Sequence, residues 1–312
     1  MIYTLTLNPS IDYVVSMEKL VEGAVNRIES EAFYPGGKGI NVSRVLTELG
    51  VINTAFGYVS GFTGAFINQE LKADGIETDF IELEQGMSRI NMKINAKLET
   101  EINGVGPTIT DEDVKKLFLK LDELQCGDLL VLAGSIPSSL PTDFYGTIMS
   151  SLSERAIQVV VDASKASLLS VLKYKPFLIK PNHHELAELF EVTMDGFDDI
   201  VFYGKKLQEL GAQNVLISRG KDGAVLLTDR GDVFQSHVPS GVVKNSVGAG
   251  DSMVAGFIAG YLKDHSYVHA LQLGAACGSA TAFCSDVAKR QDIEDLMSQI
   301  QIEKITHKVM KT

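Results

Sequence analysis

Short continuous apolar runs recur in the second half of the chain and constrain its fold more than any other feature. The four runs are Leu129–Ala133, Val159–Val161, Phe177–Ile179 and Val215–Ile217, and segments long enough for helices separate them. Such runs are typical of strands buried on both faces in a parallel sheet that helices cover on each side. The sequence therefore predicts an α/β fold with a mostly parallel sheet.

The other predicted elements follow from periodicity and from start and stop signals. A helix should begin after Thr110, because Thr110-x-x-Asp113 is typical of a capping box. The tail from Arg290 should be an amphipathic helix that frays at its end. The remaining predictions are strands at Ile2–Leu7 and Thr54–Val59, helices at Ile40–Leu49, Thr63–Ala73, Met253–Leu262 and Val268–Phe283, and a hairpin of Ala224–Leu227 with Val233–Gln235.

One stretch departs from the alternation of predicted strands and helices. Between Met87 and Val105 apolar residues such as Ile90 and Met92 alternate with polar ones such as Asn91, and no helix intervenes. This alternation predicts a half-buried antiparallel ribbon. We group it with residues 9–35 as a separate small β layer attached to a single domain that spans residues 1–312.

Composition excludes several classes of function. The net charge of −12 argues against nucleic acid as a partner. The N-terminus enters a strand pattern at once, and no apolar run is long enough to span a membrane, so we expect a cytoplasmic protein without a membrane partner. The three cysteines, widely spaced and odd in number, do not suggest a disulfide framework.

The stretch Asn245-Ser-Val-Gly-Ala-Gly-Asp251 precedes a long apolar helix and points to chemistry on an anion. Small residues at 248–250 let backbone amides turn toward one point, and the start of the helix adds further N–H groups. Together they suit a phosphate. Asp251 places a carboxylate beside that site, which is typical of a general base next to a phosphoryl group in transfer. The alternative is that Asp251 only caps the helix.

Polar residues stand just beyond all four apolar runs, and they outline the floor of a cleft. They are Ser135, Asp162, Lys180-Pro-Asn182 and Ser218-Arg-Gly220. In open parallel sheets ligands bind at the carboxyl ends of the strands. An acidic protein that handles anions needs positive charge gathered at such a cleft. The cations that we expect there are Lys38, Arg89, Lys180 and Lys221.

Three weaker motifs have two interpretations each. Pro35-Gly-Gly-Lys-Gly39 with Asn41 lacks the Lys-Ser/Thr pair of a P-loop, so it either receives a polyhydroxylated ligand or is a plain turn. Asn182 and Glu185 either bind Mg²⁺, through water, or form a capping pair. The turn Ser218–Gly223, with Lys221, fits contact with a polyphosphate but is a weak signal.

Gly36-Gly-Lys-Gly-Ile-Asn41 and Asn245–Asp251 together resemble the two signatures of the ribokinase-like (PfkB) sugar kinases. The resemblance covers essentially the whole chain in the expected order. Asn8-Pro-Ser-Ile-Asp12, Thr100-Glu-Ile-Asn103 and Lys180-Pro-Asn182 resemble the phosphosugar branch of this family. The chain is most similar to the bacterial 1-phosphofructokinases of that branch, and tagatose-6-phosphate kinase is a close relative.

The resemblance implies a ribokinase-like fold and a role for each matching position. Asp251 would be the base, and Gly248, Ala249 and Gly250 the anion hole. The sugar would contact residues of the glycine loop and of the small β layer, with Lys38 and Arg89 near its phosphate. The full set of sugar-binding residues would be Asp12, Gly36, Gly37, Lys38, Asn41, Arg89, Asn103 and Ser135. The ATP site would comprise Lys180, Asn182, Ser218, Gly220, Lys221 and Gly223, with Asn182 and Glu185 organising Mg²⁺. Many relatives have Asp-Thr where this chain has Asn245-Ser246, which leaves the role of Asn245 open.

The resemblance also implies ATP-dependent phosphorylation of a ketose monophosphate. Fructose 1-phosphate, giving fructose 1,6-bisphosphate, is the first candidate, and tagatose 6-phosphate is the alternative. A non-catalytic sugar-phosphate sensor is the rival from another class, although a pure binder would not keep an acidic residue inside an anion hole. The segments 9–35 and 87–105 would form a lid through which two copies of the chain pair as a homodimer.

Overall fold

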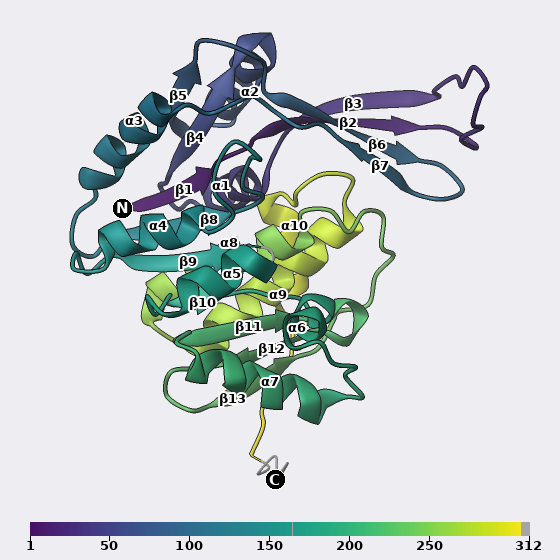
Figure 1. The fold of residues 1–312 in the computed structure, drawn as a ribbon. Helices are drawn as coiled ribbons and strands as arrows, with labels where there is room; N and C mark the ends of the chain where they lie inside the picture. Colours follow the sequence, from purple (N-terminus) through teal and green to yellow (C-terminus); the bar gives the residue numbers. More distant parts are fainter. Residues whose placement is uncertain (164, 307–312) are drawn as a thin grey trace.

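A large sheet and a smaller one organise the computed structural model, which describes residues 1–163 and 165–306 (Figure 1). In the described residues ten strands form the large sheet. Its first seven strands, in the spatial order given next, run parallel to one another, and the last three continue the sheet in antiparallel pairs. That order is β5 (Glu77–Leu83), β4 (Thr54–Ser60), β1 (Ile2–Thr6), β8 (Leu129–Ala133), β9 (Gln158–Asp162), β10 (Leu178–Ile179), β11 (Asn214–Ser218), β12 (Ala224–Leu227), β13 (Val233–Ser236) and β14 (Ile302–Lys304).

Helices cover both faces of this sheet, as the continuous apolar strands predict. One face packs against α3 (Asp111–Asp122), α4 (Phe144–Leu152), α5 (Lys165–Leu172), α6 (His183–Phe190) and α7 (Phe197–Glu209). The other packs against α1 (Lys38–Glu48), α2 (Gly61–Ala73), α8 (Ala249–Asp264), α9 (Tyr267–Phe283) and α10 (Arg290–Met297). Successive residues of one strand point to opposite faces: Leu130 and Leu132 enter the first core, and Leu129 and Val131 the second.

The predicted start of α3 is confirmed. The side chain of Thr110 accepts a hydrogen bond from the backbone N–H of Asp113, and the Asp113 carboxylate accepts one from the backbone N–H of Thr110. This reciprocal pair satisfies two amides that a helix leaves without partners. Leu117 and Leu121, which follow at helical spacing, are fully buried.

The smaller sheet projects from one end of the body (Figure 1). Its four strands in the described residues are β3 (Ser30–Gly36), β2 (Ser10–Ser16), β6 (Arg89–Asn95) and β7 (Thr100–Asn103), in that order. β6 and β7 form the predicted antiparallel ribbon, and β2 joins them by pairing in parallel with β6. Residues from two distant stretches of the chain therefore share one sheet, with Asp12 next to Asn91 in the register.

The structure differs from the sequence prediction at both edges of the large sheet. We did not predict β5, because Glu77, Asp79 and Glu82 dilute its apolar pattern as an edge strand allows. The predicted tail helix was too long: α10 ends at Met297, and β14 then pairs with β13. Its predicted fraying end, residues 307–312, lies outside the described residues.

In the described part of the chain no helix is long and apolar enough to span a membrane. Cys126, Cys277 and Cys284 are all free thiols, in agreement with the prediction that no disulfide framework exists.

Candidate active site

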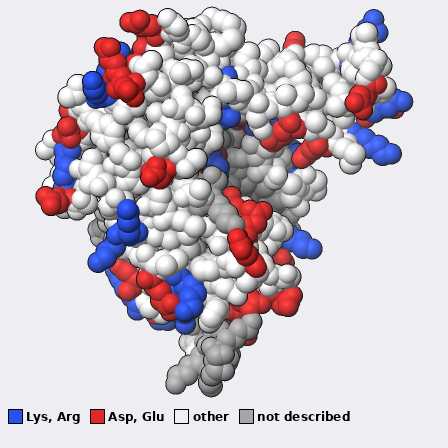
Figure 2. Space-filling view, in the orientation of Figure 1, with Lys and Arg blue, Asp and Glu red and all other residues white. Residues whose placement is uncertain are grey.

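A cavity of about 490 Å³ lies at the carboxyl ends of the parallel strands, under the smaller sheet. Figure 2 shows the molecule hollowed between the projecting sheet and the body, with basic side chains at the hollow. Predicted site residues from distant parts of the sequence converge on this cavity. They are Asp12, Gly37, Lys38, Asn41, Arg89, Asn103, Ser135, Lys180, Asn182, Glu185, Ser218, Gly248, Gly250 and Asp251.

The start of α8 forms one wall. Gly248 is its N-cap residue with a φ of 78°, a left-handed conformation that favours glycine. The first amides of a helix lack intrahelical partners, so this turn offers N–H groups to an anion. A side chain at Gly250 would be crowded, because a Cβ there would lie 3.1 Å from the ammonium of Lys180. Glycines thus let a cation and the turn approach each other.

Asp251 lies in the first turn of α8 and is only 5% exposed. Asn41 donates a hydrogen bond from Nδ2 to its Oδ2 at 2.9 Å, and Nζ of Lys38 is 3.9 Å from its Oδ1. Burial raises the pKa of Asp251; the Lys38 ammonium opposes this rise, and the Asp162 carboxylate adds to it. Among the described residues no side chain makes a capping hydrogen bond at this helix start. A buried carboxylate with a raised pKa beside an anion hole can act as a general base.

Lys38 and Lys180 share one buried carboxylate. Nζ of Lys38 donates to Oδ1 of Asp162 at 3.0 Å, and Nζ of Lys180 is 3.6 Å from Oδ2. Burial would raise the pKa of Asp162, but the two ammonium groups together lower it below its ordinary value. Conversely, burial would lower the pKa of Lys38, and Asp162 and Asp251 raise it. The cluster thus holds charged groups of both signs next to Asp251. That Lys38 lies near the phosphate of a sugar stays a prediction, since these carboxylates are its contacts here.

The smaller sheet supplies the opposite wall. The Asp12 carboxylate accepts hydrogen bonds from Ser10 Oγ at 2.8 Å, Asn91 Nδ2 at 3.1 Å and Lys93 Nζ at 2.6 Å. Gly36 lies against this group, and a Cβ at that position would be 2.5 Å from Asp12 Oδ1. The carboxylate is therefore held in one orientation while its remaining lone pairs stay available to ligand hydroxyls.

Arg89 is the cation in this wall without a carboxylate partner in the described part of the chain. Its Nε donates to the backbone oxygen of Asn8 at 3.0 Å, which fixes the side chain. Burial lowers the pKa of Arg89, and the more distant Asp12 partly offsets that effect. An immobilised and desolvated guanidinium suits a phosphate dianion. Asn103 and Ser135 line the same cavity.

Asn182 and Glu185 form a reciprocal capping box at the start of α6. The N–H of Asn182 donates to Glu185 Oε2 at 2.7 Å, and the N–H of Glu185 donates to Asn182 Oδ1 at 2.9 Å. The capping alternative is therefore observed, although both residues also line the cavity. Among the described residues no group of three or more His, Cys, Asp or Glu side chains could hold a metal ion. This donor set still fits Mg²⁺, which keeps several waters and binds one or two protein ligands plus substrate phosphates.

Part of the predicted ATP site lies outside the cavity lining. Ser218 lines the cavity at the end of β11, whereas Gly220, Lys221 and Gly223 belong to the 3₁₀ turn η1 (Gly220–Asp222) and its end. A Cβ at Gly223 would meet the backbone oxygen of Ser236 at 2.0 Å, so tight packing of β12 on β13 already requires this glycine. Ala249 and Gly36 likewise flank the cavity without lining it. Contact of these residues with a nucleotide or sugar stays a prediction.

Sequence reasoning missed several residues of the site. Asn91, Lys93 and Glu101 line the cavity from the smaller sheet, and we had not selected them. The alternation of side chains along a strand could have identified two of them, because Asn91 and Lys93 must share one face of the strand with Arg89. Asp162 was predicted only as part of the cleft floor, because its role depends on two lysines from elsewhere in the chain.

Asn245 stabilises the backbone just before Gly248 through two hydrogen bonds. Its Oδ1 accepts from the N–H of Val247 at 2.9 Å, and its backbone N–H donates to the carbonyl oxygen of Ala282 at 3.2 Å. The side-chain bond is an Asx turn, which shapes the backbone just before Gly248. Asn245 therefore holds the turn before α8 against the last turn of α9.

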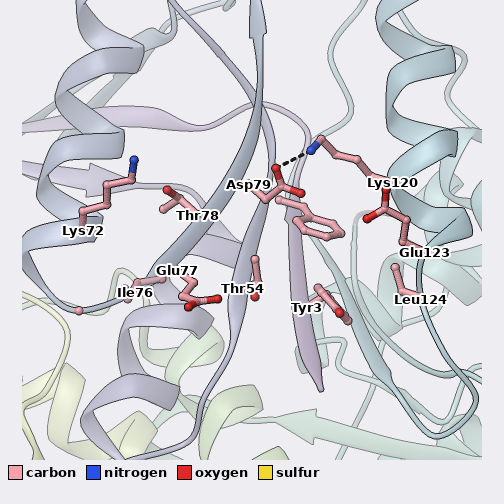
Figure 3. A pocket seen from close by; sticks show the side chains of 12 residues that line it. Tyr3, Thr54, Lys72, Ile76, Glu77, Thr78, Asp79, Lys120, Glu123 and Leu124 are labelled. Atoms are coloured by element: carbon pink, nitrogen blue, oxygen red, sulfur yellow. Dashed lines mark hydrogen bonds and ion pairs between the residues drawn. The ribbon is translucent and has the colours of Figure 1, made fainter.

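A larger cavity, of about 660 Å³, lies at the opposite edge of the large sheet. Figure 3 shows it near the amino ends of three strands, with Tyr3, Thr54 and Glu77 among its labelled side chains. Its one drawn interaction is the ion pair of Lys120 with Asp79. Ligands of parallel sheets bind at the carboxyl ends, and none of the described residues that line this cavity forms an anion hole or is a buried base. We therefore assign the chemistry to the smaller cavity.

Comparison with known proteins gives consistent matches over nearly the whole chain. A family model described as pfkB family carbohydrate kinase matches residues 5–293. The chain is 47% identical over 305 residues to a 1-phosphofructokinase of Bacillus subtilis (strain 168), which covers 98% of this chain and 100% of the relative. It is 40% identical over 303 residues to a D-tagatose-1-phosphate kinase of Bacillus licheniformis, with coverage of 97% and 99%.

A solved structure has a similar fold. The crystal structure of phosphofructokinase-2 from Escherichia coli, in complex with substrates and products, superposes with a TM-score of 0.91. The two sequences are 26% identical, and the match covers 96% of this chain and 98% of that chain. The two chains therefore share the same overall fold.

Proposed function

Since this chain belongs to the pfkB family of carbohydrate kinases, we propose that it transfers the γ-phosphoryl group of ATP to fructose 1-phosphate, giving fructose 1,6-bisphosphate and ADP. Its fold is ribokinase-like, as the resemblance predicted, and membership makes it a phosphotransferase that acts on a sugar phosphate with ATP. The alternative of a non-catalytic sensor is therefore set aside. The observation that carries the proposal is the buried Asp251 carboxylate beside the amides of Gly248–Gly250.

The chemical step needs a base, an anion site and an oriented hydroxyl. The C6 hydroxyl oxygen of the sugar attacks the γ-phosphorus, its proton passes to Asp251, and the bond between that phosphorus and the β,γ-bridging oxygen breaks. Burial raises the pKa of Asp251, which makes it a stronger base than an exposed aspartate. The hydrogen bond from Asn41 fixes one carboxylate oxygen and so orients the other.

The cations of the cavity would stabilise the charge that develops on the phosphoryl group. Lys38, 3.9 Å from Asp251 Oδ1, and Lys180, beside Gly250, lie at the anion hole. Mg²⁺, held through water by Asn182 and Glu185, would neutralise charge on the ATP phosphates. Ser218 and the turn that holds Gly220, Lys221 and Gly223 would bind the nucleotide at the adjoining edge of the sheet.

The identity of the sugar is the finer part of the proposal. Asp12, Gly36, Gly37, Asn41 and Asn103 would receive the hydroxyls, and Arg89 with Ser135 the phosphate that the substrate already carries. Two of the similar proteins act, by name, on ketoses phosphorylated at C1. D-Tagatose 1-phosphate, the C4 epimer of fructose 1-phosphate, is therefore the second candidate, ahead of the tagatose 6-phosphate that we expected from the sequence.

We further propose that the smaller sheet is a lid that closes over the sugar and pairs with the lid of a second copy. Lid closure would exclude the water that competes as phosphoryl acceptor. The sheet face away from Asp12 carries exposed apolar side chains, with Phe33 49% and Ile102 57% exposed. Sedimentation analysis tests the pairing, and a monomer at working concentration would contradict it. The cytoplasm, where ATP is available, is the compartment in which we expect the reaction.

The deciding experiment is a panel of substrates with ADP release as readout. We expect the highest kcat/KM on fructose 1-phosphate, a lower value on D-tagatose 1-phosphate, and much lower values on tagatose 6-phosphate and fructose 6-phosphate. A preference for D-tagatose 1-phosphate would change the assigned sugar and keep the phosphate at C1. A preference for either 6-phosphate would overturn the substrate assignment while leaving phosphoryl transfer intact.

A further inference from the structure

Asp162 is a buried carboxylate to which the proposed mechanism gives no task. It is the last residue of β9, at the edge of the sheet that faces the cavity, and only 1% of its surface is exposed. Its Oδ1 accepts a hydrogen bond from Lys38 at 3.0 Å. Its Oδ2, 3.6 Å from the ammonium of Lys180, has no hydrogen-bond partner in the described part of the chain. A buried charge without full partners is costly and needs a reason.

Both lysines lie at the anion hole. The Lys38 ammonium is 3.9 Å from Asp251 Oδ1, and the Lys180 ammonium is 3.1 Å from where a Cβ of Gly250 would be. They come from α1 and from the residue after β10, 142 positions apart, so no local structure aligns them. The shared contact is Asp162. The carboxylate thus sets where two long and flexible cations stand.

Resting on the proposed function, we propose that Asp162 is a positioning residue, which holds the Lys38 and Lys180 ammonium groups toward the phosphoryl group in transfer without touching it. Two cations that converge on one fixed carboxylate are already in place when the transition state forms. Such preorganisation stabilises developing charge without reorganisation at the moment of reaction.

Asp162 also sets the charge balance around the base. The cluster contains two ammonium groups and the two carboxylates of Asp162 and Asp251. Two further groups face it: Glu185 acts on Lys38, and the phenol of Tyr145 lies close to Asp162. Without the charge of Asp162 the cluster gains one net positive charge. The pKa of Asp251 must then fall, because its carboxylate loses a like charge and keeps its cations.

The test compares the full-length protein with its D162N variant, which keeps the side-chain shape and removes the charge. We expect kcat to fall about 10²-fold, as for misplaced catalytic groups, with KM for fructose 1-phosphate within a few-fold. The acid limb of the kcat/KM profile should move toward lower pH. ATP binding without sugar, measured by titration calorimetry, should tighten several-fold, since an anion site loses a nearby negative charge.

D128N is the matched control. Asp128 is also buried, with its carboxylate bonded to the amino group of Met1 and the N–H of Gln125, but it lies at the opposite edge of the sheet. Its variant should keep the wild-type acid limb and ATP affinity. A D162N enzyme with wild-type kcat and an unmoved acid limb would overturn the inference. Losses in kcat and ATP affinity that the fraction of unfolded D162N protein fully explains would also overturn it, because they indicate a purely structural role.

A second variant covers the case in which D162N does not fold. D162E keeps the charge and moves it by one methylene, so kcat should fall while the acid limb stays in place. An unchanged kcat in D162E would contradict the positioning role. The proposed function has its own test in the wild-type enzyme: absence of turnover on every ketose phosphate refutes that function, whereas the calorimetric shift in D162N still decides the role of Asp162.

Discussion

Replacing Asp251 by asparagine should separate catalysis from stability. The amide has the size of the carboxylate and can still accept the hydrogen bond from Asn41, which is 2.9 Å long in the structure. It cannot accept the hydroxyl proton. Loss of a general base lowers rates by roughly 10²–10⁴-fold. At about 1.4 kcal/mol for each factor of ten, the barrier should rise by about 3–6 kcal/mol.

The stability of this variant should not fall at neutral pH. Asp251 is 5% exposed, and its burial raises its pKa in the folded state. A carboxyl group whose folded-state pKa is raised holds more protons in the native than in the unfolded chain. Its contribution to the free energy of unfolding therefore decreases as pH rises through the folded-state pKa. An uncharged amide removes this penalty, so D251N should melt at the same temperature as the wild type or above it.

The assay is ADP release with saturating ATP and fructose 1-phosphate, together with thermal unfolding at the same pH. The wild-type kcat/KM should show an acid limb above the ordinary range of an aspartate, and the residual activity of D251N should lack it. Near-normal turnover in D251N would refute the reasoning, and Asp251 would then have a structural role only. A lower melting temperature in D251N would show that the Lys38 contact outweighs burial.

Three further substitutions test the sugar side of the cavity. R89M removes the cation that has no carboxylate partner among the described residues, so KM for the sugar phosphate should rise about 10–100-fold in steady-state kinetics while KM for ATP changes little. Equal changes in both KM values would contradict its assignment. K93M removes the 2.6 Å contact that orients Asp12, so KM for the sugar should rise by a similar factor, and K93R should restore part of the lost affinity. An unchanged KM in K93M would show that Asp12 does not need Lys93 as a partner. G36A would bring a Cβ within 2.5 Å of the Asp12 carboxylate, so kcat/KM should fall on the order of 10²-fold. Unaltered kinetics would show that the smaller sheet adjusts freely.

Local patterns in the sequence determined most of the secondary structure. Continuous apolar runs such as Leu129–Ala133 can bury all of their side chains only in a sheet that helices cover on both faces, so they predicted the parallel core. The capping box at Thr110 and the glycine before α8 were also readable, because their partners lie within a few residues. Prediction failed at β5 and β14, where edge strands carry charge and depend on a neighbour for their backbone pairing.

The sequence also predicted most of the polar residues that line the candidate site. Glycines that turn amides to one point, and polar residues at the ends of apolar strands, limit the chemistry to an anion at one sheet edge. Alternation in β6 would have added Lys93, since side chains two apart in a strand share a face. These inferences depend on neighbours along the chain, and the sequence contains such neighbours.

Only the tertiary structure decided which charges meet. Lys38 contacts a carboxylate 124 positions away, and Asn41 one that is 210 positions away. No periodicity encodes such distances, because the ends of separate strands and helices come together only when the sheet forms. The pKa of Asp251 is raised for the same reason: burial and the field of Asp162 arise from packing across the whole fold. The sequence therefore determined which groups this site can use, and the fold determined their pairing and their protonation.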